Sequence, residues 1–450
     1  MVKQREPIVA IATPFGESAI GILRLSGAGV LEKVKSLTNM KGEPKPRYAH
    51  LVKLMSRSGS MVDEVVLIYY PSPKSYTGED MVELFLHGSP LILRKALELF
   101  LSEGIRMAEP GEFTKRAFLN GKMDLLQAEA VAELISAKTD LAYRSAQRQL
   151  MGEASAQIRE LREKLLELIA YVEADIEFSE EDIPTLSKEQ VIDFLEDIKN
   201  KIDSLISTVR AGDFLRRGIN LAIVGKPNVG KSSLFNALLG KDRAIVTPIP
   251  GTTRDFLQES LNLMGVPVNL IDTAGIRQTI DPVEKIGVER SLEKLRSADL
   301  VLFVVDCSRQ LDEEDKHIHG LLQDIDHIVV LNKVDLGVRE DVMEVFPDGI
   351  KVSALKGDGI EELKQELLEK LGIHVEDSLP IYLSVRQENL LKKSEKVLKS
   401  LIDTLRIKEV FPEILMLDLR EVLSCLEEIV GVISTEELLG SIFSRFCIGK

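Results

Sequence analysis

The chain has 450 residues, of which 44% are hydrophobic and 29% are charged, and its formal net charge is −15. This composition excludes an intrinsically disordered protein, and the length allows two or three domains that each have a core. The acidic charge argues against indiscriminate nucleic-acid binding, so an RNA partner would require a local basic patch.

Other features of the sequence argue against export and membrane insertion. No apolar run approaches the length of a membrane span. The first residues, Met1–Pro7, lack a signal-peptide pattern, and Glu6 argues against a transit peptide. Cys307, Cys425 and Cys447 are widely spaced and predict neither a zinc site nor a disulfide framework. We therefore expect a cytoplasmic protein.

Residues 1–120 are expected to form an α+β domain. Strands are predicted at Ile8–Ala12, Gly21–Leu25 and Val65–Tyr70, and helices at Val30–Leu37 and Leu91–Leu101. The sequences of two polar stretches, 75–84 and 110–122, are more specific than a purely structural role requires. Neither stretch matches a template for a metal site or a catalytic nucleophile. His87, beside Gly88, is expected to be a turn or core histidine rather than a ligand.

Basic residues cluster at two places that could serve an RNA partner. They are Lys115 and Arg116 with Lys122, and Arg216 with Arg217. Ordinary solvated charges are the alternative for each pair.

Residues 121–211 are expected to form the first part of a helical domain. Apolar stripes at helical spacing favour core packing, at Leu125, Ala128, Val131, Leu134 and Ile135 and at Ile158, Leu161, Leu165, Leu166 and Ile169. After Pro184, Ser187 and Gln190 form a capping box that predicts a helix to about Val209.

The most informative stretch is Gly225–Ser233, which reads Gly-Lys-Pro-Asn-Val-Gly-Lys-Ser-Ser. An apolar run, Ile219–Val224, predicts a strand before it, and Leu234–Leu239 continues as a helix. In such a loop, backbone N–H groups and a helix N-terminus bind phosphates. Lys231 can reach the β- and γ-phosphates, and the Ser232 hydroxyl can coordinate Mg²⁺. The sequence therefore predicts a nucleoside triphosphate site.

Three later motifs, each of which follows a predicted strand, identify the nucleotide. Asp272-Thr273-Ala274-Gly275 follows Val266–Ile271 and is placed for the magnesium shell. The carboxylate of Asp335, in Asn332-Lys333-Val334-Asp335, can accept from guanine's ring N–H and exocyclic amine, and adenine lacks that amine. Ser353-Ala354-Leu355 fits a loop that closes over guanine O6. These motifs resemble the translation-factor-like GTPases and predict a GTP site, with Asn228, Val229, Gly230 and Ser233 among its phosphate-loop contacts.

Helical periodicity resumes after the short linker 372–378. Helices are predicted at Arg386–Ile407, Pro412–Val432 and Thr435–Phe446. We expect the GTPase domain, 212–376, to be inserted at a surface loop of one helical bundle whose second part is 377–450. The fold class is thus multidomain α/β and α, with an N-terminal α+β domain and an inserted Ras-like P-loop GTPase domain.

Blocks outside the GTPase motifs resemble the MnmE (TrmE) family of tRNA-modification GTPases. They are the opening Ile-Ala-Thr-Pro, Gly-Ile-Leu-Arg-Leu-Ser-Gly, Tyr-Thr-Gly-Glu-Asp, Pro-Gly-Glu-Phe-Thr-Lys-Arg-Ala-Phe-Leu-Asn-Gly-Lys and the terminal Phe446-Cys-Ile-Gly-Lys450. The resemblance runs from Ile8 to the end of the chain, and the terminal cysteine does not fit a prenylation signal.

The resemblance implies partners and further sites. Family members act with an FAD-containing partner, MnmG (GidA), to add an aminomethyl or carboxymethylaminomethyl group to the wobble uridine of certain tRNAs. Their N-terminal domain resembles a tetrahydrofolate-binding fold and forms a homodimer. The residues that contact formyltetrahydrofolate, or a related folate, map onto Arg24, Glu83, Lys122 and Lys450. Cys447 maps onto a functionally important cysteine, although the sequence alone predicts an inert one.

The family also implies how hydrolysis proceeds, because Ile276 stands where Ras-like enzymes carry a water-orienting Gln. By resemblance, a potassium ion replaces an arginine finger. Its ligands map onto Asn228 of the phosphate loop and onto Thr247, Ile249 and Thr252 of a second loop, which also holds Pro248, Pro250 and Gly251. Thr253 would join Ser232 on Mg²⁺. Glu284 maps onto the water-orienting carboxylate, and a solvated helix residue is the alternative.

Two functions from different classes stay open at this stage. The first is a GTP-hydrolysing tRNA-modification enzyme, with Lys231, Glu284 and Cys447 as candidate catalytic residues. The second is a regulatory or ribosome-assembly GTPase whose N-terminal domain only binds a partner. The folate set favours the first.

Overall fold

The computed structural model describes residues 6–177, 186–207, 209–239, 260–271, 295–373, 383–408, 410–444 and 446–450. They divide into two compact units, one formed by 1–135, 149–191 and 404–450 and the other by 136–148 and 192–403. None of the described helices combines the length and the apolar character needed to cross a bilayer.

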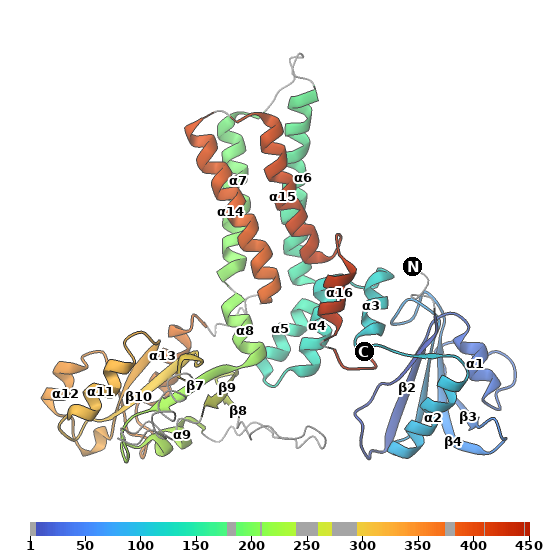
Figure 1. Cartoon of the computed structure of the whole chain (residues 1–450), viewed down its shortest axis with the longest axis horizontal. Coiled ribbons are helices and arrows are strands. Elements are labelled where there is room, and N and C mark those ends of the chain that lie inside the picture. The colour runs from blue at the N-terminus through green and yellow to red at the C-terminus, as the bar shows by residue number, and fades with distance from the viewer. Residues whose placement is uncertain are drawn as a thin grey trace, which may run out of the picture. The chain divides into compact units, whose positions relative to one another are not determined.

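The first unit begins with a six-stranded sheet of order β3-β4-β5-β2-β1-β6 (Figure 1). Its strands are β1 (Ile8–Ile11), β2 (Ile20–Ser26), β3 (His50–Met55), β4 (Met61–Tyr70), β5 (Met81–His87) and β6 (Arg106–Met107), and its helices are α1 (Val30–Ser36) and α2 (Pro90–Ser102). All pairs are antiparallel except β1 with β6. α2 packs Leu93, Ala96 and Phe100 against the sheet core. The predicted α+β character of this region is confirmed.

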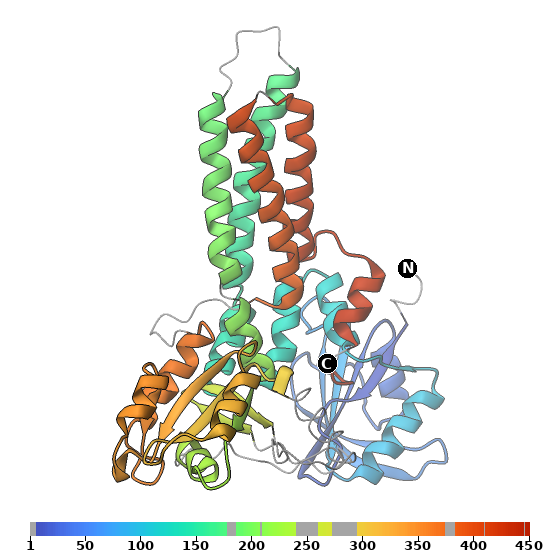
Figure 2. The same cartoon turned by 60° about the vertical axis from the view of Figure 1, so that its left-hand side comes forward.

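The helices of the first unit come from both sides of the GTPase motifs. They are α3 (Glu112–Leu119), α4 (Leu125–Ser136), α6 (Glu153–Glu177), α15 (Pro412–Val430) and α16 (Glu436–Phe443). α6 and α15 lie side by side (Figures 1 and 2). Arg162 bonds to Glu427 at 2.8 Å and Arg420 to Glu173 at 2.9 Å, so helices before and after the nucleotide-binding region pack together.

The apolar stripe predicted on α4 is only partly core. Leu125 and Ala128 are buried against Phe443 and Phe446, whereas Ile135 is 51% exposed. The stripe ends early because the chain leaves this core at the C-terminal end of α4. On α6, Ile158, Leu161, Leu165 and Ile169 are buried as predicted.

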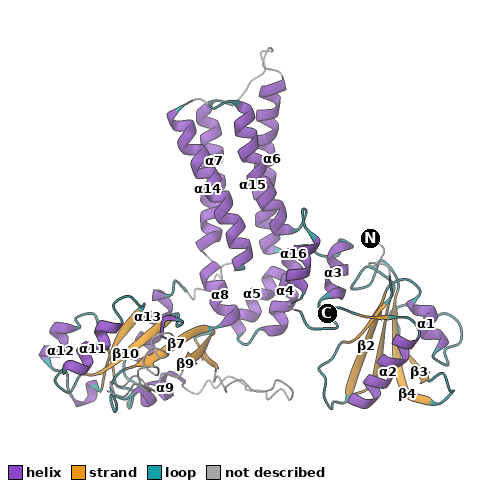
Figure 3. Ribbon diagram, in the orientation of Figure 1, coloured by secondary structure: helices purple, strands orange, loops and turns teal. Residues whose placement is uncertain are grey.

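The second unit contains a six-stranded sheet of order β12-β11-β10-β7-β9-β8, with helices around it (Figure 3). Its strands are β7 (Ile219–Val224), β8 (Ser260–Leu263), β9 (Val266–Ile271), β10 (Leu300–Asp306), β11 (His327–Asn332) and β12 (Ile350–Val352). Its helical segments are α9 (Lys231–Leu239), α11 (Glu313–Leu321), η2 (Val334–Leu336), α12 (Glu340–Val345) and α13 (Ile360–Lys370). Only β8 runs antiparallel to its neighbour. The carboxyl ends of the parallel strands therefore meet at one edge, where ligands bind in such sheets.

Further helices complete the chain. They are α5 (Asp140–Leu150), α7 (Lys188–Ser207), α8 (Val209–Arg217) and α14 (Val385–Ile407). The capping box of α7 is present, since Gln190 accepts from the Ser187 N–H at 2.8 Å and donates its own N–H to the Ser187 hydroxyl at 3.3 Å. Leu141 of α5 joins the apolar core beneath β7 and β9, which sequence periodicity did not indicate.

Candidate functional site

The phosphate loop joins β7 to α9 and depends on two glycines. A Cβ at Gly225, where φ is +143°, would lie 2.3 Å from the carbonyl oxygen of Val304. A Cβ at Gly230 would lie 2.2 Å from the amide nitrogen of Asn332. No side chain fits at either position, so glycine lets the loop pass close to Val304 and Asn332 just before α9 begins.

Lys231 begins α9 and turns its ammonium toward the loop. The Nζ atom donates to the carbonyl oxygens of Gly225 at 2.8 Å and Lys226 at 2.6 Å. Burial lowers the pKa of Lys231. Ser232 and Ser233 follow in the first turn and are exposed, and the Ser232 hydroxyl has no hydrogen-bond partner among the described residues. The hydroxyl is therefore available to a metal ion bound at this helix N-terminus.

Asn332 connects the phosphate loop with the two loops predicted to read the base. Only 2% of its surface is exposed. Its amide donates to the Val229 carbonyl at 2.9 Å and accepts from the Ala354 N–H at 3.0 Å. Sequence motifs assigned Asn332 to base reading and missed this bridging role, because a contact with a residue 103 positions away leaves no local signal.

The predicted base reader, Asp335, lies in η2 and is half-buried. Its Oδ1 atom accepts from the Ser353 hydroxyl at 2.7 Å, which orients the carboxylate at the edge where the strands end. Leu355 of the neighbouring loop is exposed. The structure thus brings together the Asn332–Asp335 and Ser353–Leu355 loops that follow β11 and β12.

Asp306, at the end of the buried strand β10, was not predicted as a site residue. It binds Lys333 Nζ at 2.7 Å, and the same ammonium donates to the carbonyl oxygen of Asn228 at 2.8 Å. Burial raises the pKa of Asp306, but hydrogen bonds from Lys333 and Ser308 outweigh it and hold that pKa below its usual range. Its place at the C-terminal end of a parallel strand was the signal that could have found it.

Several predicted site residues lie outside the described residues. They are Thr247, Pro248, Ile249, Pro250, Gly251, Thr252, Thr253, Asp272, Thr273, Ala274, Gly275, Ile276 and Glu284. Among the residues that the structure does describe, no three His, Cys, Asp or Glu side chains cluster to hold a metal ion.

A second candidate site lies in the first unit, on the N-terminal sheet. Arg24, Glu83, Lys122 and Lys450, which are far apart in the sequence, line one pocket of about 550 Å³. Such a volume suits a small organic ligand. The remaining lining residues are Arg47, Tyr70, Lys74, Ser75, Tyr76 and Met81.

Arg24 connects the pocket floor with the end of the chain. Its guanidinium bonds to Glu83 at 2.8 Å and donates to the Gly449 carbonyl at 3.0 Å. It also lies over the rings of Tyr76 and Phe113, with centroid distances of 5.6 and 5.7 Å. Burial, followed by the charge of Arg24, lowers the pKa of Lys450. Cys447 is exposed and does not line the pocket.

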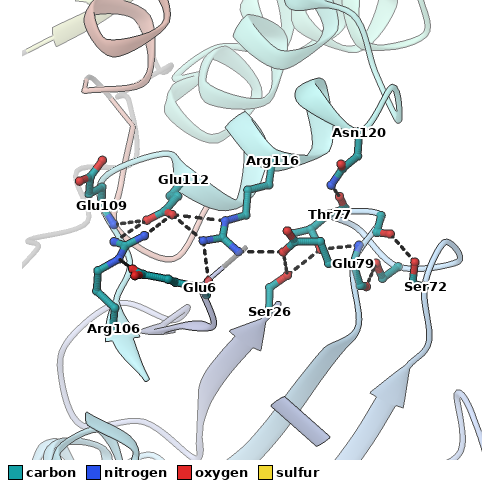
Figure 4. A network of polar contacts seen from close by, with 12 residues as sticks. Glu6, Ser26, Ser72, Thr77, Glu79, Arg106, Glu109, Glu112, Arg116 and Asn120 are labelled. Atoms are coloured by element: carbon teal, nitrogen blue, oxygen red, sulfur yellow. Dashed lines mark hydrogen bonds and ion pairs between the residues drawn. The ribbon is translucent and has the colours of Figure 1, made fainter. Parts of the chain in front are cut away.

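The two polar stretches singled out in the sequence meet in a buried network beside this pocket (Figure 4). Arg116 of α3 donates to Glu112 at 2.8 Å, to Glu79 at 2.9 Å and to the Glu6 carbonyl at 2.9 Å. Only 3% of Arg116 is exposed. The expectation that Arg116 belongs to a basic patch or is a solvated charge is therefore wrong, because acidic partners enclose it.

Two further basic side chains that the sequence singled out have acidic partners. His87 ends β5 just before the bend at Gly88, and its side chain is 71% exposed with Nδ1 2.8 Å from buried Asp63. Of the two predicted places, turn or core, it therefore occupies the turn. Arg217 is exposed and bonds to Asp299 at 2.7 Å and Asp213 at 2.5 Å, so it agrees with the alternative of an ordinary solvated charge. Asp63 and Asp299 are distant in the sequence and could not be predicted as partners from local spacing, whereas Asp213 lies four residues before Arg217.

Comparisons with known proteins cover nearly the whole chain. Residues 7–122 match the family model described as the GTP-binding protein TrmE N-terminus, and residues 125–447 match the MnmE helical domain. The chain is 62% identical to the tRNA modification GTPase MnmE of Aquifex aeolicus, over 99% of this chain and 100% of that protein. It is 45% identical to the protein of that name from Thermotoga petrophila, over 99% and 100%, and 44% identical to that of Clostridioides difficile, over 99% of both.

Proposed function

The chain belongs to the MnmE family of tRNA-modification GTPases, and from that premise we propose that it uses GTP hydrolysis to modify the wobble uridine of certain tRNAs. It acts with an FAD-containing MnmG (GidA) partner and adds an aminomethyl or carboxymethylaminomethyl group. The proposal places the protein in the cytoplasm as a homodimer formed through the N-terminal domain. The proposal is supported by two features in different parts of the chain, the phosphate loop before α9 and the pocket lined by Arg24, Glu83, Lys122 and Lys450.

The nucleotide site is suited to hold and activate GTP. The loop N–H groups and Lys231 bind the phosphates, and Asp335 reads guanine while Ser353 fixes its carboxylate. Ser232, with Thr253, would hold Mg²⁺, which neutralises charge on the phosphates when bound. Asn332 keeps the phosphate and base loops in register, so that both ends of the nucleotide are positioned together.

We assign a potassium ion to Asn228, Thr247, Ile249 and Thr252, and the positioning of water to Glu284. Asn228 fits this role because its φ of +64° and the Lys333 contact to its carbonyl fix its backbone beside the phosphate loop. Its side chain is exposed. A bound monovalent cation supplies positive charge where no arginine finger is evident from the sequence.

The pocket around Arg24, Glu83, Lys122 and Lys450 is proposed to bind a reduced folate as the one-carbon donor. A buried carboxylate suits the amine-bearing edge of a pterin, and cationic side chains suit a glutamate tail. Cys447, whose side chain is exposed, is assigned a role in the modification reaction by family resemblance.

The experiment compares GTP turnover in K⁺ and Na⁺ at constant ionic strength. An arginine finger raises the rate of phosphoryl transfer by a factor on the order of 10³–10⁵, and the potassium ion would take its place. GTP turnover in K⁺ should therefore exceed that in Na⁺ by roughly tenfold or more. Asn228→Ala should lose that response and still bind nucleotide. Asn236→Ala, at an exposed position of α9, is the matched control and should retain it. Equal turnover of the unchanged protein in both salts would refute the potassium assignment.

A further inference from the structure

The pocket on the N-terminal sheet has a strong excess of positive charge. Five cationic side chains line it, against one carboxylate, that of Glu83. They are Arg24, Arg47, Lys74, Lys122 and Lys450. The chain as a whole carries a net charge of −15, so this local excess runs against the overall composition.

Most of this charge is not neutralised within the pocket. Arg24 is paired with Glu83. Arg47 donates to the Lys74 carbonyl at 2.5 Å, and Lys122 donates to the Pro73 carbonyl at 3.0 Å, so both bind neutral oxygens. In the described part of the chain, Arg47, Lys74, Lys122 and Lys450 form no ion pair with a carboxylate. The pocket is therefore complementary to a ligand that carries several negative charges.

Burial changes from the floor of the pocket to its mouth. Met81, Ser75 and Glu83 are buried, and Lys450 is half-buried. Arg47 and Lys74 are exposed. Arg47 has a φ of +57°, a conformation that an arginine rarely adopts, and its N–H donates to the Tyr69 carbonyl at 2.8 Å. The mouth thus presents two exposed cationic side chains, Arg47 and Lys74, beyond the residues assigned to the folate itself.

We propose that Arg47 and Lys74 form a subsite for the γ-linked oligoglutamate tail of a reduced folate. This inference rests on the proposed folate function and specifies the form of folate that is preferred. The first glutamate carries carboxylates that Lys122 and Lys450 can bind. Each further glutamate adds one carboxylate, and the exposed cations at the mouth lie where a tail leaves the pocket.

An RNA phosphate backbone is the other polyanion that these cations could bind. A backbone-binding surface usually presents basic residues along a stripe or a helix. Here the cations surround a pocket, and the loop 71–75 lies between Arg47 and Lys122, bonded to both through its carbonyl groups. This arrangement favours a small ligand that enters the pocket.

The test measures by calorimetry the affinity of the full-length protein for monoglutamyl and triglutamyl 5-formyltetrahydrofolate. Exposed ion pairs each contribute up to roughly fivefold in affinity, so triglutamyl folate should bind several-fold to about tenfold more tightly. Arg47→Ala/Lys74→Ala should bind the two folates equally. Lys74→Glu should reverse the order. Lys95→Ala, at an exposed position of α2 outside the pocket, should keep the preference.

The outcomes separate this inference from the function on which it rests. Equal binding of both folates to the unchanged protein would overturn the subsite and leave the folate site standing. A preference that persists in the double variant would also overturn it. If that variant instead loses tRNA affinity and keeps its preference, Arg47 and Lys74 form an RNA-binding surface. Absence of binding to either folate would overturn the folate site and the subsite together.

Discussion

Replacing Arg116 with methionine tests whether the buried network holds α3 in place. The arginine donates to Glu112, Glu79 and the Glu6 carbonyl, and methionine fills similar space without any donor. Breaking a buried ion pair costs about 3–5 kcal/mol. Glu112 keeps Arg106 at 2.6 Å, and Glu79 keeps the Ser26 hydroxyl at 2.9 Å. We therefore expect a loss near the lower limit, about 3 kcal/mol of unfolding free energy.

The same substitution should change how stability depends on pH. Burial raises the pKa of Glu112, but bonds from Arg106, the Glu109 N–H and Arg116 outweigh it and hold that pKa below its usual range. A carboxylate whose pKa is lowered in the folded state stabilises the fold above its unfolded pKa. That contribution is lost as the pH falls through the folded value. Arg116→Met removes one of these bonds, so its stability should fall less steeply in acid than that of the unchanged protein.

Urea unfolding at neutral and acidic pH, followed by hydrogen exchange of α3 amides, measures both effects. Lys115→Met is the matched control, because it removes one positive charge from the same helix. Lys115 lies 3.8 Å from exposed Glu436, so its loss should cost less than about 1 kcal/mol. Equal losses in the two variants, or a difference that does not change with pH, would refute the role given to the network.

Four other substitutions test the two ligand sites and the segment that carries Lys450. Asp335→Asn should weaken GTP binding by roughly tenfold to a hundredfold, because it removes hydrogen bonds to a charged group, and should favour xanthosine triphosphate in competition assays; unchanged GTP affinity would contradict the assignment of the base-reading loop. Arg24→Ala and Lys122→Ala should abolish reduced-folate binding in calorimetry and leave GTP binding intact. Full folate affinity in both variants would show that these residues have only a structural role. Gly449→Ala would put a Cβ 2.5 Å from the Ile11 carbonyl, so the backbone that carries Lys450 should move and reduced-folate affinity should fall, and unchanged affinity would show that the segment is not held there.

The sequence predicted the parts of the fold that have local signals. The strand, glycine-rich loop and helix around Lys231 are continuous in the chain, so spacing and apolar periodicity identified them. The observed helix boundary differs from the predicted one by a few residues: α9 begins at Lys231 rather than after Ser233. The capping box at Ser187 was also visible, because both of its partners lie within one helical turn.

Contacts between residues that are distant in the sequence could not be predicted from local sequence patterns. Arg24 bonds to a carbonyl 425 residues away, and Arg116 to one 110 residues away. Only family resemblance grouped Arg24, Glu83, Lys122 and Lys450, because they come from different elements. Arg116 was misjudged for the same reason, since its charge is evident in the sequence and its acidic partners are not. The bridging role of Asn332 depends on a pairing of strands that no single segment encodes.

We propose that GTP hydrolysis by this chain drives wobble-uridine modification. The most direct test incubates the full-length protein with its FAD-containing partner, unmodified tRNA, a one-carbon folate and either GTP or a non-hydrolysable analogue in potassium buffer. Mass spectrometry of the tRNA nucleosides then measures the product. We expect modified wobble uridine with GTP and little or none with the analogue. Equal modification with the analogue, or none with GTP, would contradict it.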